Sequence, residues 1–364
     1  MKINNFLKKE NNNLDLIRIL LASIVILGHT TIINGKSSYW LDPIEYFFPF
    51  TYSGAIAVKL FFFISGLVVT NSYLNKNSIV YFVIARIFRI LPALLFLLVS
   101  TVFIIGPIFT NLSLGDYFLH LNGYEYIWRN MIFKTEYNLP GLFTQNLYPE
   151  AVNGSLWTLK YEVKCYIVLL CVLYIVGSSR KIILNVIISA IFIDTLLING
   201  LIFSMLGTNS EVYYLPFSFA YGAFFAINSE KIKINLWGTI ISFALFLVFR
   251  NTNYQELLMI IAFCHLTVFI SSRKFILKFK PSRDISYGIY LWGFLVQQMV
   301  YFLFGHIYAG VHFVVALLIS IILALISFVF VEKPFIDLGR KTYKLSMPKL
   351  DFLLSQSGIK IKNL

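Results

Sequence analysis

Charged residues are scarce in this sequence. Only 13% of its 364 residues are Asp, Glu, Lys or Arg, whereas 58% are hydrophobic and the mean hydropathy is +0.77. A soluble domain has about a quarter of its residues charged, because charge covers its surface. The composition therefore excludes a soluble globular protein and predicts a polytopic membrane protein.

Cysteine is also rare. The three cysteines, Cys165, Cys171 and Cys264, all fall inside apolar segments, without paired loop positions. Neither these cysteines nor the histidines have the spacing of a metal site, and no Gly-rich phosphate loop is present. The sequence therefore offers no disulfide framework, and we expect no metal and no permanently bound cofactor.

The sequence also lacks signs of processing, of a soluble domain and of internal repeats. The N-terminal segment MKINNFLKKENNN has no small-residue cleavage site behind a short apolar core, so we expect the first apolar segment to persist as a helix. The net charge of +13 does not require a nucleic-acid partner, because Lys and Arg in a membrane protein mark its cytoplasmic loops. We expect membrane lipid, and no nucleic acid, as a partner.

What is present is a series of apolar segments about twenty residues long, the length that crosses a hydrocarbon core. We expect an all-α bundle of about ten transmembrane helices. The predicted helices are Leu14–Ile33, Gly54–Leu74, Phe82–Pro107, Leu156–Val176, Ile182–Asn199, Val212–Ile227, Leu236–Phe249, Leu257–Ile270, Ile285–Phe304 and Val311–Val331.

The basic residues predict the orientation of this bundle. With the N-terminus in the cytoplasm, the cytoplasmic segments hold most of the Lys and Arg, and SSRKFILKFKPSR alone holds five. The outer segments then hold Lys36, Arg129, Lys134 and Arg250. This asymmetry predicts that both termini are cytoplasmic. We therefore divide the chain into a membrane domain, residues 1–335, and a basic cytoplasmic tail, residues 336–364. We expect this tail to lie on the membrane surface.

The longest predicted outer loop runs from Ile108 to Gly154 and is rich in Asn, Tyr and Gly. Loops of this length are usually functional or disordered. Its aromatic residues suit two different roles, stacking on sugars or lying at the membrane interface, and the sequence does not choose between them.

Ionisable residues inside the predicted helices are functional candidates, because each costs about 2.5–3.5 kcal/mol at mid-bilayer. Arg18 and His29 are eleven residues apart, nearly three helical turns, so both lie on one face about 16 Å apart along the axis. Asp15 precedes Arg18 by three residues and is placed to pair with it. The alternatives are that Arg18 extends to the membrane surface and that His29 is a hydrogen-bonded packing residue.

Two arginines form a second cluster where the third predicted helix leaves the cytoplasm. Arg86 and Arg89 are three residues apart and share a helical face, so their forked donors suit the phosphates of a cytosolic ligand. The alternative is that they only anchor the helix at the cytoplasmic surface. Pro92, just after them, favours a kink.

A buried acid forms the third cluster. Glu162 lies about two turns into the fourth predicted helix, at a depth similar to that of His29. A carboxylate bonded to an imidazole fixes its tautomer and raises its basicity, so we expect the two to pair. The alternative is that Glu162 is neutralised by Lys160 or Lys164. Asp194 is a further acid within a predicted helix, for which no partner is evident.

Six motifs together resemble the acyltransferase-3 family, integral membrane proteins that acylate, usually O-acetylate, exported carbohydrates. The first is Arg18, ten residues and His29 within LDLIRILLASIVILGHT. The others, in the family's order, are FFFISGLVVT (61–70), ARIFRILPALL (85–95), GSLWTLKYEVKCY (154–166), ISYGIYLW (285–292) and VEKPF (331–335). The resemblance covers nearly the whole chain.

The resemblance implies a membrane-embedded O-acyltransferase. Its donor would be a cytosolic acyl-CoA, with acetyl-CoA the default, and its acceptor a hydroxyl of a polysaccharide, a lipid-linked oligosaccharide or a secreted glycoside. In the family the first-helix histidine is regarded as catalytic. The predicted site residues are catalytic His29 and Glu162, acyl-CoA-binding Arg86 and Arg89, and supporting Asp15, Arg18, Ser155 and Trp157.

Two departures from the family pattern stand out. Members often carry a histidine shortly after the YLW element, where this chain has Gly293, so a second-histidine role is in doubt here. The chain also lacks the SGNH-type hydrolase domain of some members, so we expect the membrane part to act alone or with a partner protein. Low cysteine and an Ile-, Asn- and Lys-rich composition favour a bacterial plasma membrane.

Two other classes of protein compete with this interpretation. A transporter or flippase of a lipid-linked sugar would also place Arg, His and Glu in the membrane, but transporters often show paired halves with interrupted helices, which this sequence does not. A membrane scaffold would need no buried charges at this density. Within the acyltransferase interpretation, the sequence leaves direct transfer and an acyl-histidine intermediate equally open.

Overall fold

The computed structural model describes residues 1–35, 42–120, 122–149, 151–197 and 210–357. The regular secondary structure of these residues is helical, and the only extended pairings among them are two isolated bridges, Lys2 with Lys233 and Thr110 with Leu142. The predicted all-α class is confirmed. Lys36, residues 198–199 of the fifth predicted helix and residues 358–364 of the predicted tail lie outside the described residues.

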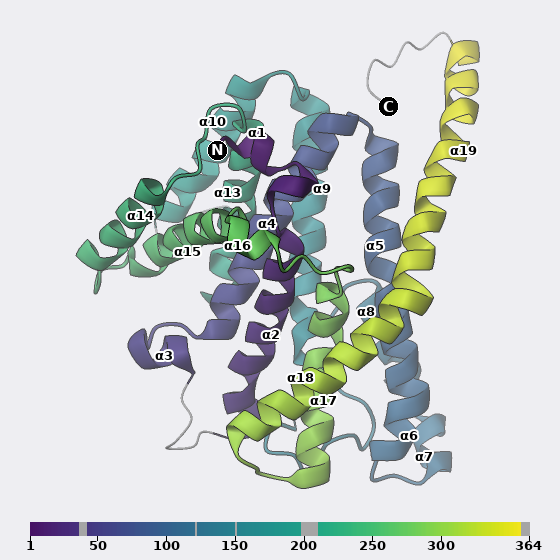
Figure 1. Cartoon of the computed structure of the whole chain (residues 1–364). Coiled ribbons are helices and arrows are strands. Elements are labelled where there is room, and N and C mark those ends of the chain that lie inside the picture. The colour runs from purple at the N-terminus through teal and green to yellow at the C-terminus, as the bar shows by residue number, and fades with distance from the viewer. Residues whose placement is uncertain (36–41, 121, 150, 198–209, 358–364) are drawn as a thin grey trace. The chain divides into compact units, whose positions relative to one another are not determined.

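A helix occupies each of the ten predicted apolar segments (Figure 1). These helices are α2 (Leu14–Ile33), α4 (Ser53–Lys76), α5 (Ile79–Ser100), α9 (Leu159–Val176), α10 (Lys181–Leu196), α13 (Leu215–Ile227), α14 (Leu236–Val248), α15 (Gln255–Ser271), α17 (Ser286–Phe304) and α18 (Ala309–Ser327). The predicted Val212–Ile227 helix is interrupted, because α12 (Ser210–Tyr213) precedes α13 and Pro216 lies in its first turn.

Five stretches of the described chain are long and apolar enough to cross a membrane. They are Leu14–Ile33, Ser53–Lys76, Ile79–Phe109, Ser286–Phe304 and Ala309–Ser346. Shorter apolar helices are α13, α14 and α15. The chain is a multi-pass membrane protein, while the number of ten crossings and the cytoplasmic position of the termini stay predictions.

The remaining elements are short, apart from the last helix. They are α1 (Ile3–Phe6), η1 (Lys9–Asn11), α3 (Pro43–Phe47), η2 (Thr101–Ile105), α6 (Gly106–Phe109), α7 (Leu114–Leu119), α8 (Asn122–Met131), η3 (Gly154–Thr158), α16 (Lys274–Leu277), η4 (Phe328–Glu332) and α19 (Lys333–Ser357).

The chain forms two compact units. The first consists of residues 1–25, 42–75 and 161–284, and the second of residues 26–41, 76–160 and 285–364. Helix α2 contributes its first part to the first unit and its last part to the second.

The asparagines before α2 explain where it begins. Asn13 accepts a hydrogen bond from the Leu16 amide (3.2 Å), which satisfies a free donor of the first helical turn. The Asn13 side chain also donates to the Ile276 carbonyl (2.6 Å), and its backbone amide donates to the Ser271 carbonyl (2.9 Å). These contacts fix the start of α2, and with it Arg18, against the segment that follows α15.

Glycines bring α4 and α13 into close contact within the first unit. A Cβ added at Gly66 would lie 2.0 Å from the Phe219 carbonyl oxygen, and one at Gly222 would lie 2.0 Å from the Phe63 carbonyl oxygen. Only residues without a side chain allow the two backbones to approach so closely. Gly66 belongs to the FFFISG motif, so the motif is partly a packing requirement.

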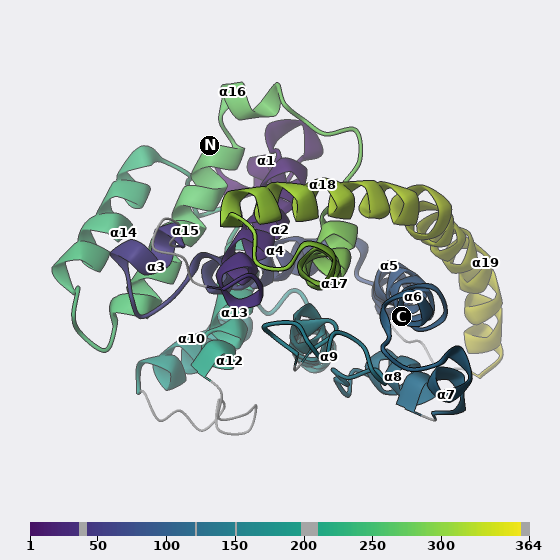
Figure 2. The ribbon, with the colours of Figure 1, turned by 90° about the horizontal axis from the view of Figure 1, so that it is seen from below.

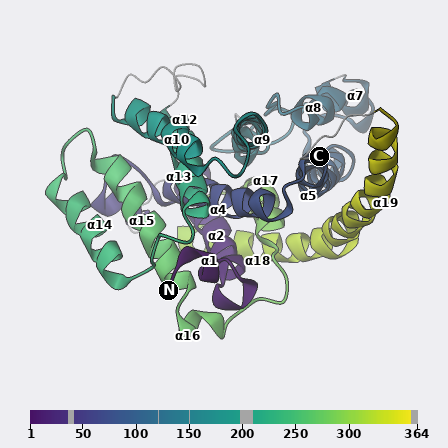
Figure 3. The same cartoon turned by 90° about the horizontal axis from the view of Figure 1, so that it is seen from above.

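Hydrogen bonds at both ends show that α10 and α13 run in opposite directions. Asn185, near the start of α10, exchanges side-chain hydrogen bonds with Asn228 at the end of α13 (2.7 and 3.1 Å). At the other end, the Tyr213 hydroxyl donates to the Thr195 carbonyl (3.2 Å). Helices α14 and α15 also lie side by side in the views from below and above (Figure 2; Figure 3).

In the second unit, α17 packs against α18. Helix α18 continues into α19 through a single π-helical turn, η4. Helix α19 lies beside α5 (Figure 1), and a Cβ at Gly339 would lie 2.9 Å from Phe88. The predicted tail is therefore helical up to residue 357 and packs on α5 near its start. Pro92 lies inside α5, which remains helical to Ser100 before the wide turn η2.

Candidate functional site

Arg18, in the second turn of α2, is held between two carboxylates. Its Nη1 atom lies 3.7 Å from Asp15 Oδ1 and 3.4 Å from Asp284 Oδ2, and the side chain is mostly buried. The predicted pairing with Asp15 is confirmed. Asp284 was missed by sequence analysis, because it lies 266 residues away in the chain. An arginine with two acidic partners is fixed in place rather than extended into solvent.

His29 lies eleven residues further along the same helix. The predicted helix that carries Arg18 and His29 is confirmed, because α2 is unbroken from Leu14 to Ile33, and ideal helical geometry places residues eleven positions apart about 16 Å from each other along the axis. The imidazole contacts the Phe294 ring edge-on, with ring centroids 5.1 Å apart. Its Nδ1 atom is buried and makes no hydrogen bond within the described residues of its unit. The imidazole is therefore positioned by packing, which leaves its nitrogens for chemistry.

Gln297 on α17 holds the part of α2 that carries His29. Its Nε2 atom donates to the Ile26 carbonyl (2.9 Å) and to the Thr30 hydroxyl (3.0 Å), on either side of His29 in sequence. A Cβ added at Gly293, one turn earlier on α17, would lie 2.7 Å from Ile26 Cγ1. The position where family members often have a histidine is thus closely packed here and has no room for an imidazole.

Gln298 joins α17 to the loop of residues 108–154 that is predicted to lie outside. Its Nε2 atom donates to the carbonyls of Tyr148 (2.6 Å) and Ala151 (2.7 Å), while Asn146 donates to the Gln298 side chain (2.8 Å) and backbone (3.0 Å). These four hydrogen bonds are buried or partly buried. Gln297 and Gln298 are adjacent on α17. The first holds the part of α2 that carries His29, and the second holds residues 146–151 of the loop.

The SLW turn packs onto the same neighbour of His29. A Cβ at Gly154 would lie 2.5 Å from Phe294 Cε2. Ser155 is buried, its amide donates to Asn153 Oδ1 (3.1 Å), and its carbonyl accepts from the Tyr290 hydroxyl (2.9 Å). Ser155 thus contributes through its backbone, and Trp157 lies partly exposed in the same turn.

Glu162, in the first turn of α9, has two hydroxyl partners in its own unit. The Ser65 hydroxyl donates to Glu162 Oε1 (3.3 Å), Tyr166 donates to the same oxygen, and the Ser65 and Tyr166 oxygens lie 2.7 Å apart. Lys164 instead lies over the Tyr161 ring, 5.5 Å from its centroid. Neutralisation of Glu162 by Lys160 or Lys164 stays an alternative prediction.

The pairing of Glu162 with His29 stays a prediction, because the two residues belong to different compact units. Ser65 and Tyr166 were not selected by sequence analysis, although both lie in motifs that it identified. The signal that could have found Tyr166 is its spacing, because a residue four positions after Glu162 on a helix faces the same side.

Arg89 on α5 is engaged by a second missed acid. Its Nη1 atom donates to Glu332 Oε2 (3.5 Å), and its guanidinium lies 5.9 Å from the centre of the Tyr287 ring. Glu332 is buried and also accepts from the Ser327 hydroxyl (3.4 Å). Arg86 lies nearly one turn before Arg89 on α5 and is partly buried. The VEKPF motif thus supplies a partner for an arginine of the third predicted helix.

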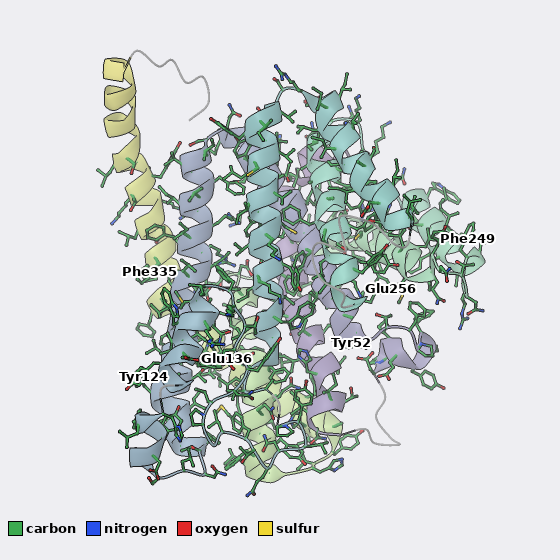
Figure 4. All side chains as sticks on the ribbon, turned by 180° about the vertical axis from the view of Figure 1, so that it is seen from behind. Tyr52, Tyr124, Glu136, Phe249, Glu256 and Phe335 are labelled. Atoms are coloured by element: carbon green, nitrogen blue, oxygen red, sulfur yellow. The ribbon has the colours of Figure 1, made fainter. Side chains whose placement is uncertain are left out.

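A buried ion pair in the first unit also escaped sequence analysis. Lys59, in the second turn of α4, donates to Glu256 (2.7 Å), which lies at the start of α15 and is labelled in Figure 4. The Lys59 side chain is only 2% exposed. Its position just before the FFF run hid it among apolar residues. Across the described part of the chain, no three His, Cys, Asp or Glu residues are grouped so as to hold a metal ion.

Comparison with known proteins gives two matches. A family model described as an acyltransferase domain matches residues 11–331. An "O-acetyl transferase" of Shigella phage Sf6 is 28% identical over 354 residues, which cover 93% of this chain and 99% of the phage protein. No solved structure matches.

Proposed function

The chain belongs to the acyltransferase-3 family, and from that premise we propose that it is a membrane O-acetyltransferase. It moves an acetyl group from cytosolic acetyl-CoA, or another acyl group from its CoA ester, to a hydroxyl of a surface or exported carbohydrate. Support for the acetyl group comes from the similarity to the phage O-acetyl transferase. Support for the carbohydrate comes from the sequence motifs shared with the family.

The observation that carries this proposal is the geometry of α2. Arg18 lies near the start of α2 and is paired with two carboxylates. His29 lies near the end of α2, and its buried Nδ1 atom makes no hydrogen bond within the described residues of its unit. His29 is four residues from Ile33, about 6 Å along the axis from the end of the helix. A donor from one side and an acceptor from the other can meet at such a residue.

In the proposed reaction, His29 is the general base. It takes the proton of the acceptor hydroxyl as the oxygen attacks the thioester carbonyl. The carbon–sulfur bond then breaks, the thiolate leaves and is protonated to CoA, and the acceptor retains the new ester. Glu162, held by Ser65 and Tyr166, supports the imidazolium that forms. The acyl-histidine route differs only in that the imidazole nitrogen attacks first.

We place the donor's phosphates against Arg86 and Arg89. Arg18 contributes to the architecture of the site instead, because two carboxylates already offset its charge. Arg89 lies 3.5 Å from the Glu332 carboxylate and is partly exposed, and a CoA molecule carries several phosphate charges, so in this proposal Arg89 contacts both groups.

The test uses purified protein in nanodiscs with labelled acetyl-CoA. The acceptor is polysaccharide from cells that lack this protein. We expect His29→Ala to lower acceptor acylation by at least about 100-fold, the typical contribution of a positioned base. His120→Ala, an exposed histidine of the outer loop, is the matched control and should act like wild type. Normal acylation by His29→Ala contradicts the assignment, and movement of a lipid-linked acceptor across proteoliposomes without acylation by wild type supports a flippase.

A further inference from the structure

The ring of Phe294 lies between His29 and an aromatic residue of the outer loop. Its centroid is 5.1 Å from that of His29 and 6.1 Å from that of Tyr148, and both contacts are edge-on. Phe294 itself is buried, whereas His29 and Tyr148 are each partly exposed. The outer loop therefore reaches the immediate surroundings of the proposed catalytic base.

Tyr148 is one of three tyrosines that pack against the same apolar cluster, which includes Phe294. Tyr137, Tyr148 and Tyr301 all pack, partly buried, against a core made of Ile33, Ala151 and Phe294. Ile33 is one turn beyond His29 on α2, so the tyrosines pack against the end of the helix that carries the proposed base. None of these six residues is charged.

Both loop tyrosines are held in place by hydrogen bonds to their backbone carbonyls. The Val152 amide donates to the Tyr137 carbonyl (2.8 Å), and the Tyr148 carbonyl accepts from Gln298 (2.6 Å). Because Gln298 and Gln297 are adjacent on α17, the same helix holds Tyr148 and the part of α2 that carries His29. A binding site needs this kind of fixed relation between the groups that hold a substrate and the group that reacts.

Other aromatic residues of the outer loop have different surroundings. Tyr124 and Trp128 lie on one face of α8, and Tyr126, on the opposite face, is buried. The Tyr124 ring contacts Phe103 of η2 (6.4 Å between centroids), and Phe103 is exposed on an apolar membrane-crossing segment. Tyr124, labelled in Figure 4, therefore belongs with the lipid-facing surface, where aromatic belts occur.

We infer that Tyr137, Tyr148 and Tyr301 form the acceptor subsite beside His29 and bind a neutral sugar ring. This inference rests on the proposed function, in which the acceptor hydroxyl comes within about 3 Å of His29. Groups that surround the outer side of His29 must then surround the acceptor. Tyrosine offers an apolar ring face to the C–H groups of a sugar and a hydroxyl to its polar edge.

The test compares alanine variants of the two aromatic sets in nanodiscs. Acceptor polysaccharide from cells lacking this protein and labelled acetyl-CoA serve as substrates. We expect Tyr137→Ala and Tyr148→Ala each to raise the KM for polysaccharide about tenfold, the effect of losing one aromatic contact. The KM for acetyl-CoA and the acceptor-independent release of CoA should stay within about twofold.

Tyr124→Ala and Trp128→Ala are the matched controls, and both should leave the KM for polysaccharide within about twofold of wild type. Tyr148→Phe, which keeps the ring, should stay closer to wild type than Tyr148→Ala and also serves if the alanine variant does not fold. An unchanged polysaccharide KM in both loop variants overturns the subsite, and so does an equal rise in the controls. Absence of any acyl transfer by wild type overturns the proposed function instead.

Discussion

Arg89 of α5 pairs with Glu332, whose side chain is 0% exposed, at a distance of 3.5 Å. Glu332 is the last residue of the π-helical turn η4, which connects α18 to α19. The pair thus ties α5 to the junction of the two last helices. A residue predicted to meet a phosphate group is already held by a buried carboxylate, so its position does not depend on the donor.

Glu332→Gln should destabilise the protein measurably. Exposed ion pairs contribute about 0.2–1 kcal/mol, and loss of one partner of a buried pair costs about 3–5 kcal/mol. The Arg89 side chain is 26% exposed, so the expected loss lies between these ranges, near 2 kcal/mol by the same principles. Thermal unfolding in detergent, followed by fluorescence, measures it.

The control for this prediction is Asp337→Asn, which breaks the exposed pair with Arg340 (2.9 Å) on α19. It should change the free energy of unfolding by less than about 0.5 kcal/mol. Equal losses of unfolding free energy in the two variants would show that burial of Glu332 does not strengthen its pair with Arg89.

Tyr166→Phe and Ser65→Ala should lower activity without loss of protein. Each removes a hydroxyl that donates to Glu162, and hydrogen bonds to charged groups contribute about 1.5–3 kcal/mol. If Glu162 supports the base, kcat should fall about tenfold or more, with the KM for acetyl-CoA unchanged. Tyr174→Phe, an exposed tyrosine of the same helix, is the control. A wild-type kcat in both variants would remove Glu162 from the mechanism.

Gly66→Ala and Gly222→Ala should disrupt the contact of α4 with α13. The new Cβ atoms would lie 2.0 Å from backbone oxygens, which cannot rotate away, so the helices must separate. Overpacking typically costs about 1–3 kcal/mol, and a backbone clash should reach at least the upper end. Gly115→Ala in α7, where the nearest atom is 3.8 Å away, is the control and should be tolerated. The yield of monodisperse protein after solubilisation reports the outcome.

Lys59 and Glu256 should show strong coupling in a double-mutant cycle. Lys59→Met alone leaves a partly buried carboxylate, and Glu256→Gln alone leaves a buried ammonium group. The double variant should therefore lose less unfolding free energy than the sum of the losses in the two single variants. The coupling free energy should exceed about 1 kcal/mol. The exposed pair of Lys181 and Glu230 (3.7 Å) should give less than about 0.5 kcal/mol in the same unfolding assay. Similar values for both pairs would contradict the importance of burial.

Local features were predictable from the sequence. The predicted limits of the first apolar helix, Leu14 and Ile33, are those observed, because hydropathy and the capping asparagines before Leu14 act over a few residues. The pair of Asp15 with Arg18 followed from helical spacing alone. The acyltransferase family was likewise recognisable, because its motifs are short and occur in a fixed order.

Contacts distant in sequence were decided only by the tertiary structure. Arg18 meets Asp284 across 266 residues, Arg89 meets Glu332 across 243, and Ser65 meets Glu162 across 97. Helical periodicity says which face of its own helix a residue occupies, but it does not say which face of another helix packs there.

The sequence by itself determined the class of the protein, the positions of its apolar helices and the residues to test first. The tertiary structure decided the partners: two acids for Arg18, two hydroxyls for Glu162, and the aromatic surroundings of His29. The physical reason is that the free energy of burying an ionisable or hydrogen-bonding group depends on the atoms placed around it, and folding brings those atoms from distant parts of the chain.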